Sequence, residues 1–85
     1  MEEITARLLA FIRQRFLDDD TQTKLTETTP LLEWGILSSL NMVVLLEHIR
    51  AEFGSPVPPD RINARHFRNV ATIAAMVHDL QAVRA

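Results

Sequence analysis

The sequence predicts an all-α fold, a small four-helix bundle of three long helices and one short helix with a long first connection. Apolar residues recur at helical spacing in three stretches, no stretch alternates as a strand does, and proline and glycine separate the stretches. The chain has 85 residues, of which 47% are hydrophobic, so it can build one small core but hardly a deep active site. We therefore expect a single domain over residues 1–85 that is not itself an enzyme.

The first helix is predicted over about residues 2–17. Three aspartates, Asp18 to Asp20, follow it, and we expect the helix to end there because negative charge at its carboxyl end opposes the helix dipole. The residues expected to face the core are Ile4, Leu8, Phe11, Ile12 and Phe16.

A long connection is predicted over residues 21–37. Pro30 disfavours helix at Thr29, and Gly35 allows a sharp corner. A connection of this length in a small domain needs apolar side chains of its own to hold it against the core. We expect these to be Leu25, Leu31, Leu32 and a partly buried Trp34.

The second helix is predicted over residues 39–53, and Gly54 stands where a helix is commonly closed. The apolar residues expected on one of its faces are Leu40, Val43, Leu46, Ile49 and Phe53. Three prolines between residues 56 and 59 exclude regular helix, and a short helix is expected at about 60–64.

The last helix is predicted over residues 70–83, with Asn69 as its cap and Phe67 packing inward before it. Its expected core residues are Val70, Ile73, Ala74, Val77 and Leu80.

The composition of the chain argues against several classes of function. The net charge of -2 and pI near 5.8 argue against nucleic-acid binding, and the cluster Arg61, Arg65 and Arg68 is interpreted as a solvated face beside a helix start. There is no cysteine, and His48, His66 and His78 lack the spacing of metal ligands, so no metal site is expected. An acidic start unlike a secretory signal, and no run long enough to span a bilayer, favour a cytoplasmic protein without membrane contact.

Ser39, at the start of the second helix, is the most informative residue for function. The first turn of a helix has backbone N–H groups without partners in the helix, and the dipole adds partial positive charge, so a phosphate ester there is stabilised. A serine at this place is also an ordinary helix cap, and the local pattern alone does not separate the two interpretations.

Wider context carries a resemblance. Ser39-Leu40 opens an apolar run through Phe53, Thr29 to Leu37 precedes it, and Phe67 to Ile73 leads into the last helix. In these segments the chain resembles phosphopantetheine-dependent carrier proteins, the acyl and peptidyl carriers, and most closely the discrete aminoacyl and D-alanyl carriers. Their Asp-Ser-Leu signature aligns its serine with Ser39, whereas Ser38 stands in place of the aspartate that helps a transferase recognise the site. Ser38 still supplies an N-cap oxygen, without the charge.

The resemblance implies a bundle of the acyl-carrier-protein type, with a 4'-phosphopantetheine arm from coenzyme A attached to Ser39. The arm would hold an aminoacyl or acyl group as a thioester, in specialised (natural-product) biosynthesis. The partners implied are a phosphopantetheinyl transferase, an adenylating ligase and downstream acyl-processing or transferase enzymes, and we expect a monomer. Partner contact is expected on the second helix, with His48 on its exposed side, and at Trp34; the helix residues are Leu40, Val43, Val44, Glu47 and His48.

Two alternatives remain open at this point. An acyl carrier of a polyketide or fatty-acid-like pathway would share the fold and the arm and differ in its acyl donor. A helical protein-binding adaptor without a prosthetic group would use Ser39 only as a cap and present its apolar side chains to another protein.

Overall fold

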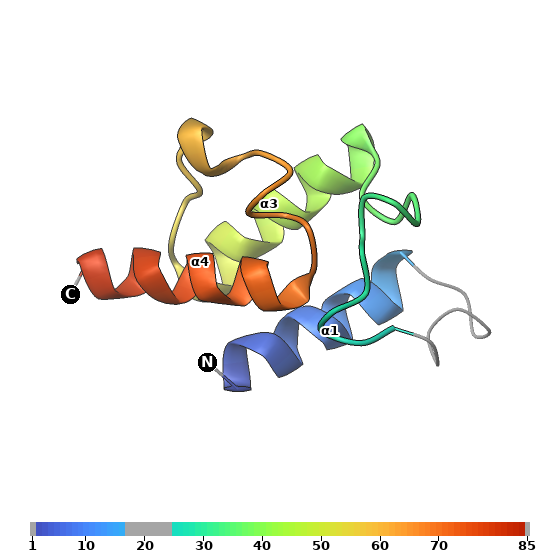
Figure 1. Ribbon diagram of the computed structural model, residues 1–85. Coiled ribbons are helices and arrows are strands. Elements are labelled where there is room, and N and C mark those ends of the chain that lie inside the picture. Colours follow the sequence, from blue (N-terminus) through green and yellow to red (C-terminus); the bar gives the residue numbers. More distant parts are fainter. Residues whose placement is uncertain (1, 17–24, 85) are drawn as a thin grey trace.

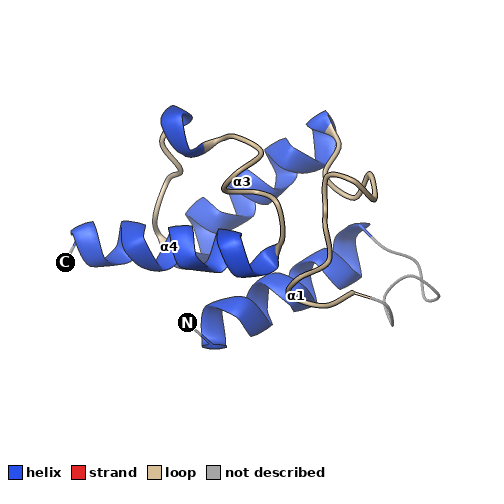
Figure 2. Ribbon diagram, viewed as in Figure 1, coloured by secondary structure: helices blue, strands red, loops and turns tan. Residues whose placement is uncertain are grey.

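The structure is a computed structural model that describes residues 2–16 and 25–84. Within these ranges it has three α-helices, α1 (Glu2–Phe16), α3 (Ser39–Phe53) and α4 (Val70–Arg84), and no strand (Figures 1 and 2). Helices α1 and α4 run beside each other, and α3 crosses them so that its first turn lies on the upper side of the molecule in Figure 1. The all-α prediction is confirmed for the described part of the chain.

The short fourth helix is reduced to one 3-10 turn, η1 (Pro59–Arg61). The predicted helix at about 60–64 does not form because Ile62 leaves the helical region, with φ -89° and ψ 82°. In addition, the Asn63 side chain donates to the carbonyl of Asp60 over 3.0 Å, which occupies an oxygen that a continuing helix would use.

Helix α1 buries the stripe that its spacing predicts. Ile4, Leu8 and Ile12 are buried, while Phe11 and Phe16 are half-buried at the edge of the core. Its charges also suit the dipole, with Glu2 and Glu3 in the first turn and Arg13 and Arg15 in the last. The aspartates expected to end this helix, and Leu17, lie outside the described residues.

Helix α3 turns a different face to the core from the one predicted. Its buried residues are Leu45 and Ile49, whereas Leu40 is 73% exposed and Val43 64% exposed. Leu40 precedes Ile49 by about two and a half helical turns, so the two side chains point to opposite sides of the helix. The expectation that Leu40 and Val43 share the core face with Ile49 is therefore wrong, and two large apolar side chains face outward instead.

Main-chain hydrogen bonds tie the connection before α3 to the segment before α4 and to the first turn of α4. The Leu31 N–H donates to the Arg68 carbonyl over 2.9 Å, and the Ala71 N–H donates to the Glu27 carbonyl over 2.9 Å. Of the four residues expected to hold this connection, Leu25 and Leu31 are buried as predicted. Leu32 is not buried, since it is 37% exposed, and Trp34, expected to be partly buried, is 48% exposed.

The helix ends predicted at Gly54 and Asn69 are present. Gly54 closes α3 with φ 67°, and its N–H donates to the Arg50 carbonyl. Asn69 caps α4 reciprocally, because its Oδ1 accepts from the Thr72 N–H at 2.9 Å while the Thr72 Oγ1 accepts from the Asn69 N–H at 3.2 Å. Phe67, fully buried just before this cap, fixes the end of the last loop in the core as expected.

Candidate functional site

The amino end of α3 is built on Ser38. Its backbone is extended, with φ -75° and ψ 174°, and its Oγ accepts from the Asn41 N–H over 3.3 Å. Its carbonyl accepts the first helical hydrogen bond, from the Met42 N–H at 2.8 Å. Ser38 is therefore the N-cap, and Ser39 is the first residue of the helix.

Ser39 is exposed, and among the described residues its hydroxyl makes no hydrogen bond. The first turn of α3 carries no acidic residue, so no carboxylate on that turn repels an anion. An oxygen at this position reaches solvent beside the positive end of the helix dipole. The local chemistry thus fits a phosphate ester on the Ser39 hydroxyl.

A short corner holds this serine in place. Gly35 takes a left-handed conformation, with φ 71°, and its N–H donates to the Leu32 carbonyl. Ile36 and Leu37, both buried, then anchor the chain just before the cap. The Asn41 side chain donates to the Ile36 carbonyl over 2.8 Å, which ties the first turn of α3 back to the corner. Ser39 is thus presented by a supported turn.

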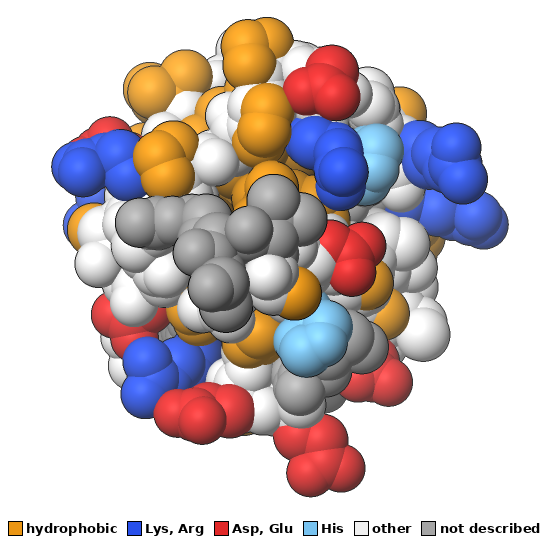
Figure 3. Space-filling model, turned by 90° about the vertical axis from the view of Figure 1, so that its left-hand side faces the viewer, with side chains coloured by type: hydrophobic (Ala, Val, Ile, Leu, Met, Phe, Trp, Pro, Cys, Tyr) orange, Lys and Arg blue, Asp and Glu red, His pale blue; other side chains and the backbone are white. Residues whose placement is uncertain are grey.

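Large apolar side chains are exposed around this end of the molecule. They come from the corner, the first two turns of α3 and the residue after η1, which all lie in the upper half of Figure 1. Figure 3 shows the face at the left of Figure 1, on the side of η1, where other hydrophobic side chains gather at the top. We call the first set the apolar surface: Leu32, Trp34, Leu40, Val43 and Ile62.

Leu32 and Ile62 were not predicted to take part in such a surface. Leu31 and Leu32 are consecutive, and the sequence does not show which of them is buried. In the structure Leu31 is buried and Leu32 faces outward. Ile62 follows a proline-rich stretch with no periodicity, so the sequence carries no signal for it. Since exposed apolar patches mark contact sites, both residues belong with the candidate contact surface.

Glu47 lies on the outer side of α3, and Arg50 holds it in an ion pair through both carboxylate oxygens. The hydrogen bonds and charge of Arg50 lower the pKa of Glu47, and those of Glu47 raise the pKa of Arg50. Val44, near this pair in sequence, is half-buried. A groove between α3 and the segment after it is lined by Val43, Leu46, Glu47, Arg50, Pro56 and Val57. The Glu47–Arg50 ion pair has no net charge, so this outer face of α3 is nearly neutral, as the mixed sequence of the helix indicates.

His48 does not lie on the exposed side of α3, and that expectation is wrong. Its ring stacks on Phe11 of α1, with centroids 3.7 Å apart and planes 8° apart, and the ring of Phe53 meets it edge-on. Its Nε2 is buried and has no partner among the described residues. Glu52, one turn further along α3, pairs with Arg7 of α1, so this side of α3 faces α1.

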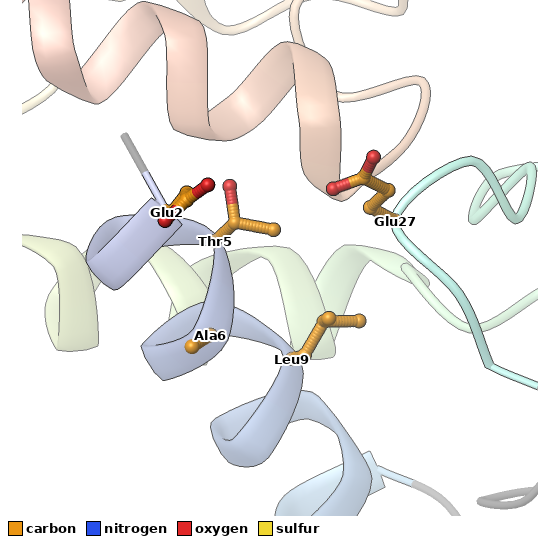
Figure 4. Close-up of a pocket in the computed structure, with 5 residues that line it drawn as sticks. All are labelled: Glu2, Thr5, Ala6, Leu9 and Glu27. Carbon is orange, nitrogen blue, oxygen red and sulfur yellow. The ribbon is translucent and has the colours of Figure 1, made fainter.

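A second hollow lies away from Ser39, against α1. Figure 4 shows Glu2, Thr5, Ala6 and Leu9 on that helix and Glu27 on the connection opposite them.

Within residues 2–16 and 25–84, no three His, Asp or Glu side chains come together as metal ligands do. No helix in these ranges is long and apolar enough to cross a membrane.

Comparison with known proteins agrees with this geometry. The family described as "Phosphopantetheine attachment site" matches residues 6–78. A chain of a crystal structure described as that of an FAD-dependent dehydrogenase is 46% identical, with a TM-score of 0.74. The match covers 84% of this chain and 99% of that one. Among curated proteins, none matches significantly.

Proposed function

The chain belongs to the family of phosphopantetheine-attachment domains, and we propose that it is a carrier protein whose 4'-phosphopantetheine arm is attached to Ser39. Membership in the family implies that this prosthetic group is covalently bound. Ser39 is exposed, is the first residue of α3 and lies inside the matched range. This observation supports Ser39 as the attachment residue. Carrier domains of this kind are generally not catalytic, and we propose the same here.

Each residue at the start of α3 has a distinct part in this proposal. The Ser39 oxygen forms the bond to phosphorus when a transferase delivers the arm from coenzyme A, and 3',5'-ADP leaves. The open N–H groups of the first turn then face the phosphodiester. Ser38 and Asn41 keep this turn closed through their own hydrogen bonds. The arm, when attached, supplies a thiol that holds the cargo as a thioester.

We propose that the cargo is an aminoacyl group, loaded by an adenylating ligase in natural-product biosynthesis. The outer face of α3 supports this choice, because the Glu47–Arg50 pair leaves it without the net acidic charge that would attract strongly basic enzymes. Leu40, Val43 and Trp34 then supply most of the contact with partner enzymes. A polyketide-type or fatty-acid-type acyl cargo is the alternative, and loading assays separate the two.

An FAD-dependent dehydrogenase is the partner that we propose to act on the tethered group. The support comes from the chain in the matching crystal structure. The match takes in 99% of that chain but only 84% of this one, so that chain is no longer than a carrier domain. A chain so short is too small for a dinucleotide-binding domain. In the proposed reaction two hydrogens leave the tethered group, and FAD is reduced by them.

Intact mass after incubation with coenzyme A and a broad-specificity phosphopantetheinyl transferase tests the attachment. We expect the wild type and Ser38→Ala to gain the mass of the arm and Ser39→Ala to gain nothing. A gain that survives Ser39→Ala would reject this attachment site, and no gain in any protein would reject the carrier function.

The cargo is tested on the protein that carries the arm. Amino acids with an adenylating ligase, and malonyl or acyl coenzyme A with a transferase, are offered separately, and the acylated mass is recorded. We expect loading by the ligase; loading only from acyl donors would favour the alternative. Adding the dehydrogenase should then lower the mass of the loaded protein by two hydrogens.

A further inference from the structure

The segment from η1 to the start of α4, residues 59–69, concentrates positive charge in a chain whose net charge is -2. Three of its nine Lys and Arg residues, Arg61, Arg65 and Arg68, fall in this segment, against a single carboxylate, Asp60. Arg65 and Arg68 are exposed and Arg61 is half-buried.

None of these arginines forms an ion pair with a carboxylate in the described part of the chain. The ion pairs found there join Arg7 to Glu3 and Glu52, and Arg50 to Glu47. Glu33 lines the same groove as Arg68, together with Pro30, Leu32 and Ala64, without a contact short enough to be an ion pair. The charge of the segment therefore faces solvent.

Hydrogen bonds make this segment a fixed platform. The Asn63 side chain donates to the Asp60 carbonyl and accepts from the His66 N–H over 3.0 Å. The Thr72 hydroxyl donates to the His66 carbonyl over 3.0 Å, and the buried Phe67 ring anchors the next residue. Arginines carried by a held turn lose less freedom on binding than arginines on a mobile loop would.

The platform adjoins the apolar surface around Ser39. The Arg68 carbonyl accepts from Leu31, next to the exposed Leu32, and Ile62 lies between Arg61 and Arg65 in sequence. In Figure 3, Lys and Arg side chains beside a His gather at the upper right, next to hydrophobic side chains at the top. An apolar centre with a charged margin is the usual anatomy of a protein–protein interface.

We propose that Arg61, Arg65 and Arg68 form a second docking site, which binds an acidic patch on the enzyme that acts on the tethered group. The proposal rests on the proposed carrier function. The apolar surface and the neutral face of α3 supply contact area, but they do not determine in which orientation the carrier binds. The positive charge lies on one side only, so its attraction to an acidic patch determines how Ser39 is oriented toward the enzyme. Three arginines in an acidic chain are too few for a nucleic-acid footprint, so a protein partner is favoured.

The test compares Arg65→Glu/Arg68→Glu with Arg15→Glu, a charge reversal at an exposed position on α1. Binding of each protein, with and without the arm, to the FAD-dependent dehydrogenase of the matching crystal structure is measured at low and high salt. The double variant should bind about tenfold more weakly than wild type at low salt, with the difference shrinking to about twofold at high salt. Arg15→Glu should stay within about twofold of wild type.

Several results would overturn the proposal: no binding by the wild type, a double variant that binds like wild type, or an equal loss in Arg15→Glu. Loss only in proteins that carry the arm would overturn it too, because the arginines would then act on the phosphate of the arm. A circular-dichroism melt checks that the variants fold. Arm attachment, read by mass in the same proteins, tests the carrier function separately, since only failure of wild-type modification counts against that function.

Discussion

The His48 ring lies flat on the ring of Phe11, and this stack joins α3 to α1. One turn away, the Arg7 guanidinium donates to the Glu52 carboxylate over 2.8 Å. The two contacts pair residues 7 with 52 and 11 with 48, so the helices run antiparallel where they meet. A titratable ring thus forms part of the contact between two helices, and its charge state bears on stability.

Acid should weaken this contact. Burial lowers the pKa of His48 from its usual value near 6.5, and the charge of Glu52 opposes the shift only in part. Arg7 already neutralises Glu52 through their ion pair, and the buried Nε2 would gain a proton with no acceptor. As pH falls below about 6.5, the unfolded chain binds this proton first, so stability is lost until the lowered pKa of the folded protein is reached.

Thermal unfolding between pH 7.5 and 5 measures the effect. We expect His48→Phe, which keeps an aromatic ring on Phe11, to lose less in Tm than wild type over this range. His78→Phe, at an exposed position on α4, is the control and should follow the wild type. Parallel curves for wild type and His48→Phe would show that a cation–π contact with Phe11 offsets the cost of burial.

Two leucines of α3, one buried and one exposed, give a contrast in stability. Leu45 is fully buried and Leu40 is 73% exposed on the same helix. Leu45→Ala should cost about 2–5 kcal/mol of unfolding free energy, because it leaves a cavity in the core. Leu40→Ala should change it by less than about 0.5 kcal/mol. Urea unfolding of both variants checks this, and a larger loss for Leu40→Ala than for Leu45→Ala would mean that α3 buries the face that its sequence spacing predicts.

The sequence predicts the helices of this fold well because each has a physical marker. Periodic apolar residues define α1, the Asn69 cap defines the start of α4, and Gly54 defines the end of α3. The core face of α3 is harder to predict, because apolar residues surround most of that helix. Leu40 and Val43 fit an apolar stripe as well as Leu45 does, and only packing against α4 and the corner decides between them.

In the candidate site, too, local features can be predicted from the sequence, whereas features that depend on packing cannot. Ser39 is found from its register before an apolar run, since the start of a helix is a local feature. His48 is misplaced because a histidine among polar neighbours reads as solvated, and its partner Phe11 is far away in sequence. Ile62 has no local signal at all, and its exposure depends on how the proline-rich segment crosses the surface.

Restoring the missing charge at the N-cap should speed attachment of the arm. Ser38→Asp keeps a cap oxygen and adds a carboxylate beside Ser39, which a basic transferase surface would attract. We expect kcat/KM for modification to rise severalfold, measured by the rate of mass gain. Ser38→Asn caps as well without charge and should stay near the wild-type rate. Equal rates for the two variants would show that charge at this position has no part in recognition.

Gly35 sets the corner that leads to Ser39, and its φ of 71° disfavours other residues. A Cβ built there meets nothing within 4 Å, so the cost of Gly35→Ala comes from the backbone alone. We expect a loss of about 1–2 kcal/mol for alanine, and a smaller one for Gly35→Asn because asparagine adopts the left-handed conformation more readily. Urea unfolding measures both variants. If alanine were tolerated as well as asparagine, the corner would have to relax to a negative φ, and the Gly35–Leu32 hydrogen bond beside the serine would then be lost.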